Sequence, residues 1–94
     1  MNKTLSVGIG ASVIYESAGP EMCLPVPLTV AVYPGSGGTV TVQQRIAATG
    51  TWKNATEGLA GTIAADLTTV IDGYISGLKF TAATAAATIE LASP

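Results

Sequence analysis

Hydrophobic and polar residues alternate in two neighbouring stretches near the middle of the chain, residues 28–33 and 39–46. The apolar side chains that share one face are Leu28, Val30 and Val32 in the first stretch and Val40, Val42 and Ile46 in the second. A period of two is typical of a β-strand with one face on a core. Pro34–Gly38 between them is rich in turn-forming residues, so the chain is expected to reverse there. We therefore predict a β-hairpin over residues 28–46, with the other strands organised around it.

Two shorter extended segments are expected before this hairpin. Residues 3–9 alternate cleanly, but Gly8 and Gly10 favour a bend, so this segment is either a strand or a flexible arm. Residues 12–16 form a second candidate strand, and residues 17–21 form a loop. Residues 22–27 are apolar but contain Pro25 and Pro27, which suits the edge of a sheet and not its centre.

The region after the hairpin has a weaker pattern. The single tryptophan, Trp52, follows a turn in a short strand, and its large apolar area favours a place in the core opposite the hairpin. The alternative is an exposed Trp52 that stacks on a sugar ring. Residues 57–67 mix helical spacing with glycines and threonines, and we interpret them as a loop plus a short strand, with one helical turn as the alternative.

The last third of the chain returns to clear alternation. A turn at Asp72-Gly73 leads into a strand in which Leu78, Phe80 and Ala82 share one face. A small-residue turn at 83–86 precedes a final strand over 87–91. In total the pattern predicts an all-β fold, a small antiparallel β-sandwich or barrel of about seven short strands. At 94 residues, the chain 1–94 is expected to be a single β domain, with 1–10 as a possible extended N-terminal arm.

Composition changes the picture in one respect. Charged residues make up only 11% of the chain, against about 25% in ordinary soluble domains. Few charges and many small apolar residues suggest surfaces that are covered by copies of the chain or by a larger assembly. The four basic residues are scattered along the sequence, so a nucleic-acid partner is not expected. No membrane partner is expected either, because prolines and glycines interrupt the longest uncharged run, and the chain is predicted to be made in the cytoplasm.

The sequence contains little reactive chemistry. It has no histidine, and its one cysteine, Cys23, lies between Met22 and Leu24, where a buried and inert thiol is expected. The six carboxylates occur singly, and Asp66 and Asp72 are interpreted as solvated loop acids. We therefore predict no enzymatic activity, no catalytic residues, no cofactor and no metal.

Three segments together carry a family resemblance. They are the prolyl run into the predicted hairpin, the Trp52 strand and the ending that runs from Asp72 to Leu91. In this order they resemble the small β-sandwich virion proteins of tailed bacteriophages, the capsid decoration or cement proteins, over about two-thirds of the chain.

The resemblance implies a structural subunit without catalysis that binds and stabilises the assembled phage head, often as a homotrimer. Its partner would be the major capsid protein and its location the capsid surface of the virion. The apolar row Leu5, Val7 and Ile9 is the predicted capsid contact. Two alternatives stay open, a tail or fibre structural protein and a carbohydrate- or host-binding module. Against the latter, Tyr15, Tyr33 and Tyr74 are too scattered in the sequence to predict an aromatic platform.

Overall fold

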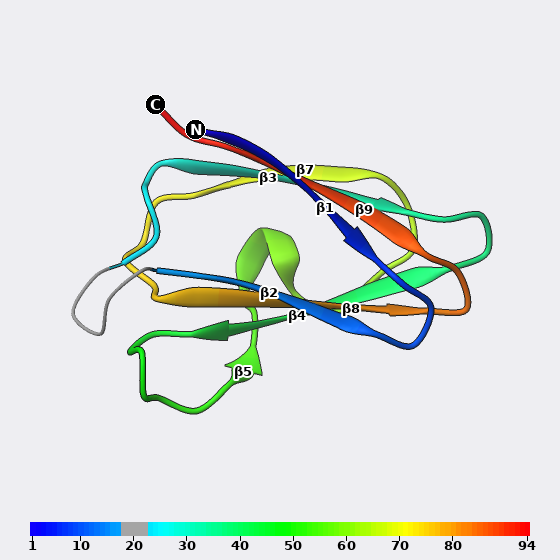
Figure 1. Ribbon diagram of the computed structural model, residues 1–94, viewed down its shortest axis with the longest axis horizontal. Coiled ribbons are helices and arrows are strands. Elements are labelled where there is room, and N and C mark those ends of the chain that lie inside the picture. Colours follow the sequence, from blue (N-terminus) through cyan, green and yellow to red (C-terminus); the bar gives the residue numbers. More distant parts are fainter. Residues whose placement is uncertain (18–22) are drawn as a thin grey trace.

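The computed structural model describes residues 1–17 and 23–94. In these residues nine strands and one 3-10 helix form two antiparallel sheets that pack face to face (Figure 1). The elements are β1 (Asn2–Val7), β2 (Ser12–Glu16), β3 (Leu28–Pro34), β4 (Thr39–Arg45), β5 (Lys53–Asn54), η1 (Glu57–Leu59), β6 (Thr62–Ile63), β7 (Leu67–Ile71), β8 (Gly77–Ala83) and β9 (Ala87–Ala92). The predicted all-β antiparallel sandwich is confirmed. The described strands exceed the expected seven because β5 and β6 are two-residue pairings with β4.

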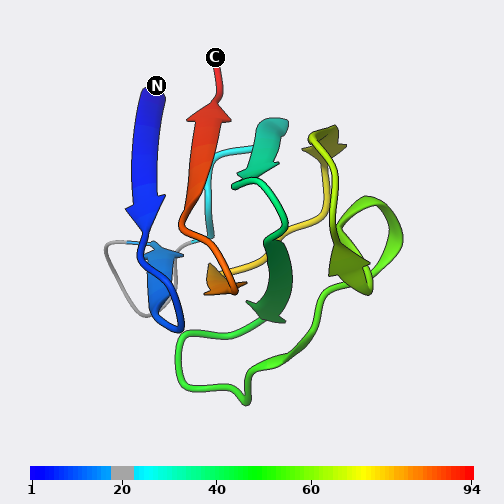
Figure 2. The ribbon, with the colours of Figure 1, turned by 90° about the vertical axis from the view of Figure 1, so that its right-hand side faces the viewer.

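The two sheets share one apolar core. One sheet, called the first sheet here, has the strand order β1-β9-β3-β7, and the second has β2-β8-β4-β5 (Figure 2). As expected, Phe80 and its neighbours Leu78 and Ala82 point inward from β8, and each is completely buried. They meet the apolar sides of β3 and β9 across the sandwich. The remaining fully enclosed apolar positions include Leu24, Leu28, Val30, Val32, Val40 and Ile89.

The predicted hairpin over residues 28–46 is wrong, although the bounds of its two strands are close to those observed. β3 pairs with β7 and β9 in the first sheet, whereas β4 pairs with β5, β6 and β8 in the second. The turn at Pro34–Gly38 therefore carries the chain from one sheet to the other. Val32 and Val40 face the core in this arrangement, and they would also face it in a hairpin. Alternation identifies the buried face of a strand but not the strand that pairs with it.

The turn that joins β3 to β4 packs against the turn that joins β8 to β9. A Cβ atom on Gly35 would collide with the backbone oxygen of Ala86, and one on Gly38 would lie 2.7 Å from the Cβ of Ala85. Gly37 has a φ of 75°, in the left-handed region that glycine adopts without strain. The glycines of this segment thus permit close packing of two sheet-to-sheet connections.

The N-terminal segment is a strand and not a separate arm. β1 pairs with β9 over its whole length, from Asn2 opposite Ala92 to Val7 opposite Ala87. Its amino group also donates a hydrogen bond to the carbonyl of Ser93 at 2.7 Å. The chain then bends at Gly8–Ala11, as the glycines suggested, and enters β2 in the other sheet.

The buried thiol predicted for Cys23 is also wrong, because the side chain is exposed. Its neighbour Leu24 takes the inward position, with its N–H bonded to the carbonyl of Ile75 at 2.8 Å. In an extended segment, adjacent side chains point in opposite directions, so the burial of Leu24 turns Cys23 outward. Residues 23–27 form no strand, and of the predicted loop at 17–21 only Ser17 lies within the described residues.

The ambiguous region over residues 57–67 contains both of the expected features. η1 provides the single helical turn, and the short strand β6 follows it, before β7 begins at Leu67. Figure 1 shows the η1 turn at a level between the two sheets, and Figure 2 shows it at their β7 side. Leu59 of this turn is buried and contributes to the core on the side of β7. The turn therefore closes a flank of the sandwich that the sheets alone would leave open.

Candidate functional site

A groove of about 580 Å³ lies at the end of the sandwich where β7 stops and β8 begins. Its walls come from four separate parts of the chain, namely β7, η1, the end of β4 and the 72–75 loop. The lining residues are Gln44, Ile46, Thr56, Gly58, Leu59, Thr69, Val70, Ile71, Asp72, Gly73, Tyr74 and Ile75. Apolar and hydrogen-bonding side chains are mixed in this lining, which is typical of a binding surface.

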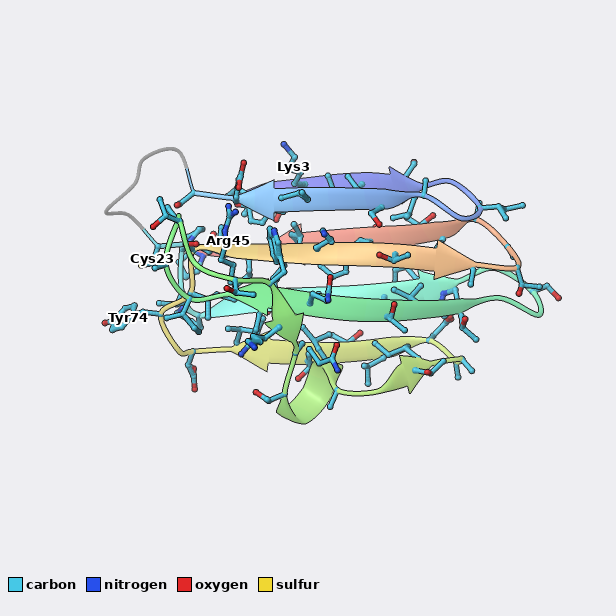
Figure 3. The ribbon with its side chains drawn as sticks, turned by 90° about the horizontal axis from the view of Figure 1, so that it is seen from below. Lys3, Cys23, Arg45 and Tyr74 are labelled. Carbon is cyan, nitrogen blue, oxygen red and sulfur yellow. The ribbon has the colours of Figure 1, made fainter. Side chains whose placement is uncertain are left out.

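Exposed apolar side chains concentrate around this groove. Tyr74 is 75% exposed, Ile46 is 62% exposed and Val70 is 58% exposed, and all three line it. In Figure 3, Tyr74 projects from the end of the sandwich. Single exposed apolar residues are ordinary, but a cluster next to a hollow marks an interaction surface. We name Ile46 and Tyr74, with the groove between β7 and η1, the loop-end surface.

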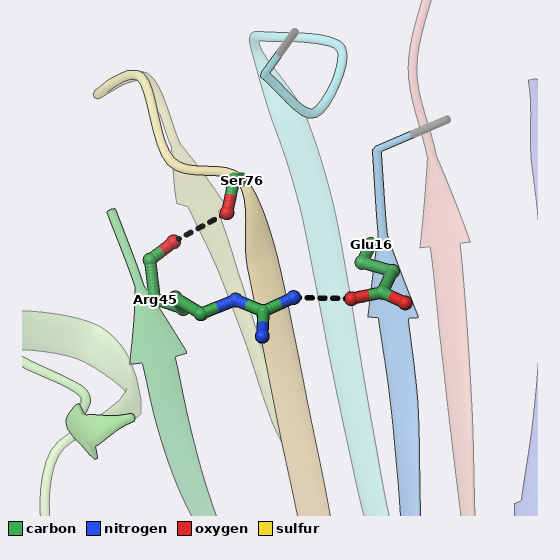
Figure 4. Close-up of polar contacts among 3 residues, drawn as sticks. All are labelled: Glu16, Arg45 and Ser76. Carbon is green, nitrogen blue, oxygen red and sulfur yellow. Dashed lines mark hydrogen bonds and ion pairs between the residues drawn. The ribbon is translucent and has the colours of Figure 1, made fainter. Parts of the chain in front are cut away.

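An ion pair and two hydrogen bonds hold one wall of this surface. The guanidinium Nη2 of Arg45 pairs with the carboxylate of Glu16 (Figure 4). The carbonyl of Arg45 accepts hydrogen bonds from the N–H of Ser76 at 2.9 Å and from its hydroxyl at 3.2 Å. Arg45 thus joins the ends of β2, β4 and β8 and fixes the start of Ile46 next to the end of the 72–76 loop.

Trp52 is not in the core, so the prediction that it fills the core is wrong. It lies half-buried on the outer face of the second sheet, where its ring covers Gly77. The Arg45 guanidinium lies 4.5 Å from the ring centroid, and the Lys79 ammonium lies 5.2 Å from it. Phe80 takes the core position instead, because alternation along β8 points it inward between Leu78 and Ala82. With its ring occupied by two cations, Trp52 is poorly placed to stack on a sugar.

The predicted contact row Leu5, Val7 and Ile9 does not form one exposed surface. Val7 is buried in the core and Leu5 packs partly against it, because both face inward from β1. Ile9 follows the bend at Gly8 and is 67% exposed. Only Ile9 therefore remains available as a contact. It belongs to the connection between β1 and β2, which lies at the opposite end of the sandwich from Tyr74 (Figure 3).

The three tyrosines occupy separate environments. Burial beside β1 raises the pKa of Tyr15, whose hydroxyl points to the Met1 sulfur at 3.9 Å. On the outside of the first sheet, a hydrogen bond to Glu90 raises the pKa of Tyr33, with burial and the charges of Glu90 and Asp66 acting in the same direction. Both phenols therefore stay protonated at neutral pH. Only Tyr74 is at the loop-end surface, so the structure forms no platform of several aromatic rings from these side chains.

The carboxylates and Cys23 are also dispersed. Over residues 1–17 and 23–94, no three side chains of histidine, cysteine, aspartate or glutamate lie close enough together to hold a metal ion. Asp66 and Asp72 are both exposed and flank β7 at its two ends. No helix in the described part of the chain has the length and apolarity needed to cross a membrane.

Comparison of the chain with protein-family models, with curated proteins and with solved structures finds no match.

Proposed function

We propose that this chain is a non-catalytic structural subunit that binds the outside of an assembled protein shell, as the capsid decoration proteins of tailed bacteriophages do. The observation that carries the proposal is the loop-end surface, where Ile46 and Tyr74 are exposed beside a groove. Large apolar side chains that remain in water at the rim of a hollow favour contact with another protein. The partner in this proposal is the major capsid protein, and the location is the capsid surface of the virion.

Two further observations support a structural role. The chain has few charges, and its sequence resembles small virion proteins of this class. The Arg45 contacts to Glu16 and Ser76 fix the backbone on one side of the loop-end surface, which limits the backbone entropy lost on binding. A rigid subunit that bridges neighbouring shell proteins opposes their separation, even when each copy binds with modest affinity.

The double substitution Ile46→Ser with Tyr74→Ser is expected to weaken binding to purified heads by at least about tenfold. Burial of each large apolar side chain contributes about 1.5–3 kcal/mol, and 1.4 kcal/mol corresponds to a factor of ten in affinity. Co-sedimentation with heads assembled from the major capsid protein of the same genome measures the effect. Thermal unfolding of the free variant checks that the sandwich is intact.

Ile9→Ser is the matched control, because Ile9 is equally exposed but lies at the other end of the sandwich. It is expected to bind heads as tightly as the original chain. If Ile9→Ser weakens binding and the double variant does not, the contact is at the β1–β2 bend. If the original chain does not bind heads at all, the decoration role is wrong.

A carbohydrate- or host-binding role is the second candidate, and it rests on Tyr74. This exposed ring lies in the same groove as Asp72 and Gln44, a combination that suits stacking on a sugar and hydrogen bonding to its hydroxyls. Binding of the original chain to bacterial surface glycans, abolished by Tyr74→Ser, would favour this role over shell binding. The tail or fibre alternative predicts binding to purified tails and not to heads.

A further inference from the structure

We propose that copies of this chain associate by strand addition, with β1 of one copy pairing antiparallel to the free edge of β7 in the next copy. β1 and β7 are the two edges of the same four-stranded sheet (Figure 2). Their pairing would join the first sheets of neighbouring copies into one continuous antiparallel sheet. This inference concerns contacts between copies. The added strand occupies the groove beside β7, and Ile46 and Tyr74 at its rim are the part of the loop-end surface left to bind the shell.

The sequence of β7 lacks the charges and prolines that normally prevent strand addition. Leu67–Ile71 contains no charge and no proline. Four of its five residues are β-branched (two Thr, one Val and one Ile), and β-branched residues favour strands. Within the described residues, β7 pairs with β3 alone, so its other side has no ladder partner. η1 packs against Thr69 of β7, and the groove between η1 and β7 is the space that an added strand would enter.

The other edges are better protected. β2 ends in Glu16, which is ion-paired, and the opposite edge of the second sheet consists of β5 and β6, each only two residues long. β1 carries a charged residue, Lys3, on its inner-facing side, which disfavours pairing with arbitrary strands. We therefore take β1 as the strand that is added and β7, beside η1, as the edge that receives it.

Charge selects β1 as the strand that β7 accepts. Asp66 and Asp72 flank β7, and in the described residues neither has an ion-pair partner. Two copies of β7 paired about a two-fold axis would bring Asp66 of each copy opposite Asp72 of the other, which is repulsive. β1 offers the opposite charge, because Lys3 and the amino terminus lie at its start.

Matching the inner faces of the two strands fixes the register. Lys3 then lies opposite Ile71, Leu5 opposite Thr69, and Val7 opposite Leu67. In this register Asn2 lies opposite Asp72, so Lys3, the amino terminus and Asp72 share one end of the contact. The outer-face pairs are Thr4 with Val70 and Ser6 with Thr68. Leu5 and Leu67, both only partly buried in the single copy, become covered.

Antiparallel pairing also fixes how the copies are oriented. β1 and β7 run in opposite directions within one chain, so antiparallel addition requires neighbouring copies to point the same way (Figure 1). All copies of Tyr74 then face one side of the assembly. A head-to-tail contact of this kind gives a ring when its rotation closes, and the resemblance to decoration proteins favours a ring of three.

Cross-linking tests the register. In a Cys23→Ser background, Thr4→Cys and Val70→Cys chains of different tag length are mixed and mildly oxidised. The two Cβ atoms are expected about 4.5–5.5 Å apart, so the mixture should give a disulfide-linked pair of unequal chains, and each variant alone should give none. The matched control replaces Val70→Cys by Thr41→Cys, an exposed position on the second sheet. Homodimers of Val70→Cys, or no more product than the control gives, would overturn the proposal.

Charge exchange gives an independent test. Lys3→Glu alone and Asp72→Lys alone should each weaken self-association about two- to threefold, because each places like charges at the same end of the contact. The double variant Lys3→Glu with Asp72→Lys should restore the original association constant. Failure of the double variant to recover, with both single variants folded, would contradict the pairing even if binding to heads is observed.

Discussion

Phe80→Ala is expected to destabilise the fold by about 3–5 kcal/mol, the range for truncation of a buried aromatic side chain. Phe80 is completely buried and lies opposite Val13 and Val42 in its sheet. Its removal leaves a cavity that the rigid inner faces cannot fill. Urea unfolding followed by circular dichroism measures the change.

The informative comparison is Trp52→Ala, which we expect to cost only about 1–2 kcal/mol, for partial burial and two cation–π contacts. Trp52 is the larger side chain, so a greater loss at position 52 than at position 80 would contradict the placement of Phe80 in the core. Thr41→Ala, at an exposed position of β4, is the control and should change stability by less than about 0.5 kcal/mol.

Deletion of residues 1–10 is expected to unfold the chain or to lower its stability by more than about 3 kcal/mol. The deletion removes β1, including buried Val7, and exposes the flank of β9 with which β1 pairs. If residues 1–10 were a separate arm, their deletion would leave a folded core that only loses affinity for its partner. Circular dichroism and thermal unfolding of the truncated chain distinguish the two.

Ser6→Ala is a suitable control for this deletion, because Ser6 is exposed on the same strand and its substitution leaves the ladder intact. The control is expected to unfold within a few degrees of the original chain. If the truncated chain keeps the full transition temperature, β1 does not contribute to the sandwich in solution. The strand-addition proposal would then lose its donor as well.

The amino-acid pattern is sufficient to predict most strands and their buried faces. Alternation placed Val30, Val42 and Ile89 inside, and all three are, but it also placed Ile46 on the core face, and Ile46 is 62% exposed. It could not predict the sheet to which each strand belongs. The turn at Pro34–Gly38 joins two sheets here, yet the same residues would suit a hairpin, because both arrangements bury the same side chains.

The errors at single residues have a similar cause. Cys23 and Trp52 were assigned by residue type, as a small apolar thiol and a large ring, but position along an extended segment decides which side chain faces inward. Leu24 holds the inward position beside Cys23, and Phe80 of β8 fills the core place predicted for Trp52. Apolar character alone therefore overstates burial at the ends of strands and in connections.

The loop-end surface could not be predicted because no local pattern describes it. Its residues come from the end of β4, from η1, from β7 and from the 72–75 loop, which only the folded chain brings together. Two signals were nevertheless present in the sequence. Ile46 lies one residue beyond the end of its strand, and Tyr74 directly follows the Asp72-Gly73 turn, where a large apolar side chain has little of its own chain to pack against.

Sedimentation equilibrium of the full chain, from low micromolar to several hundred micromolar, tests most directly the claim that this protein acts as an assembling subunit. We expect the average mass to rise with concentration toward three chains, and the midpoint of thermal unfolding to rise with it, because association stabilises the folded state. High salt should shift the association to higher concentration, since Lys3 and Asp72 attract across the proposed contact. A chain that remains a monomer with a concentration-independent unfolding midpoint over the whole range would contradict the account.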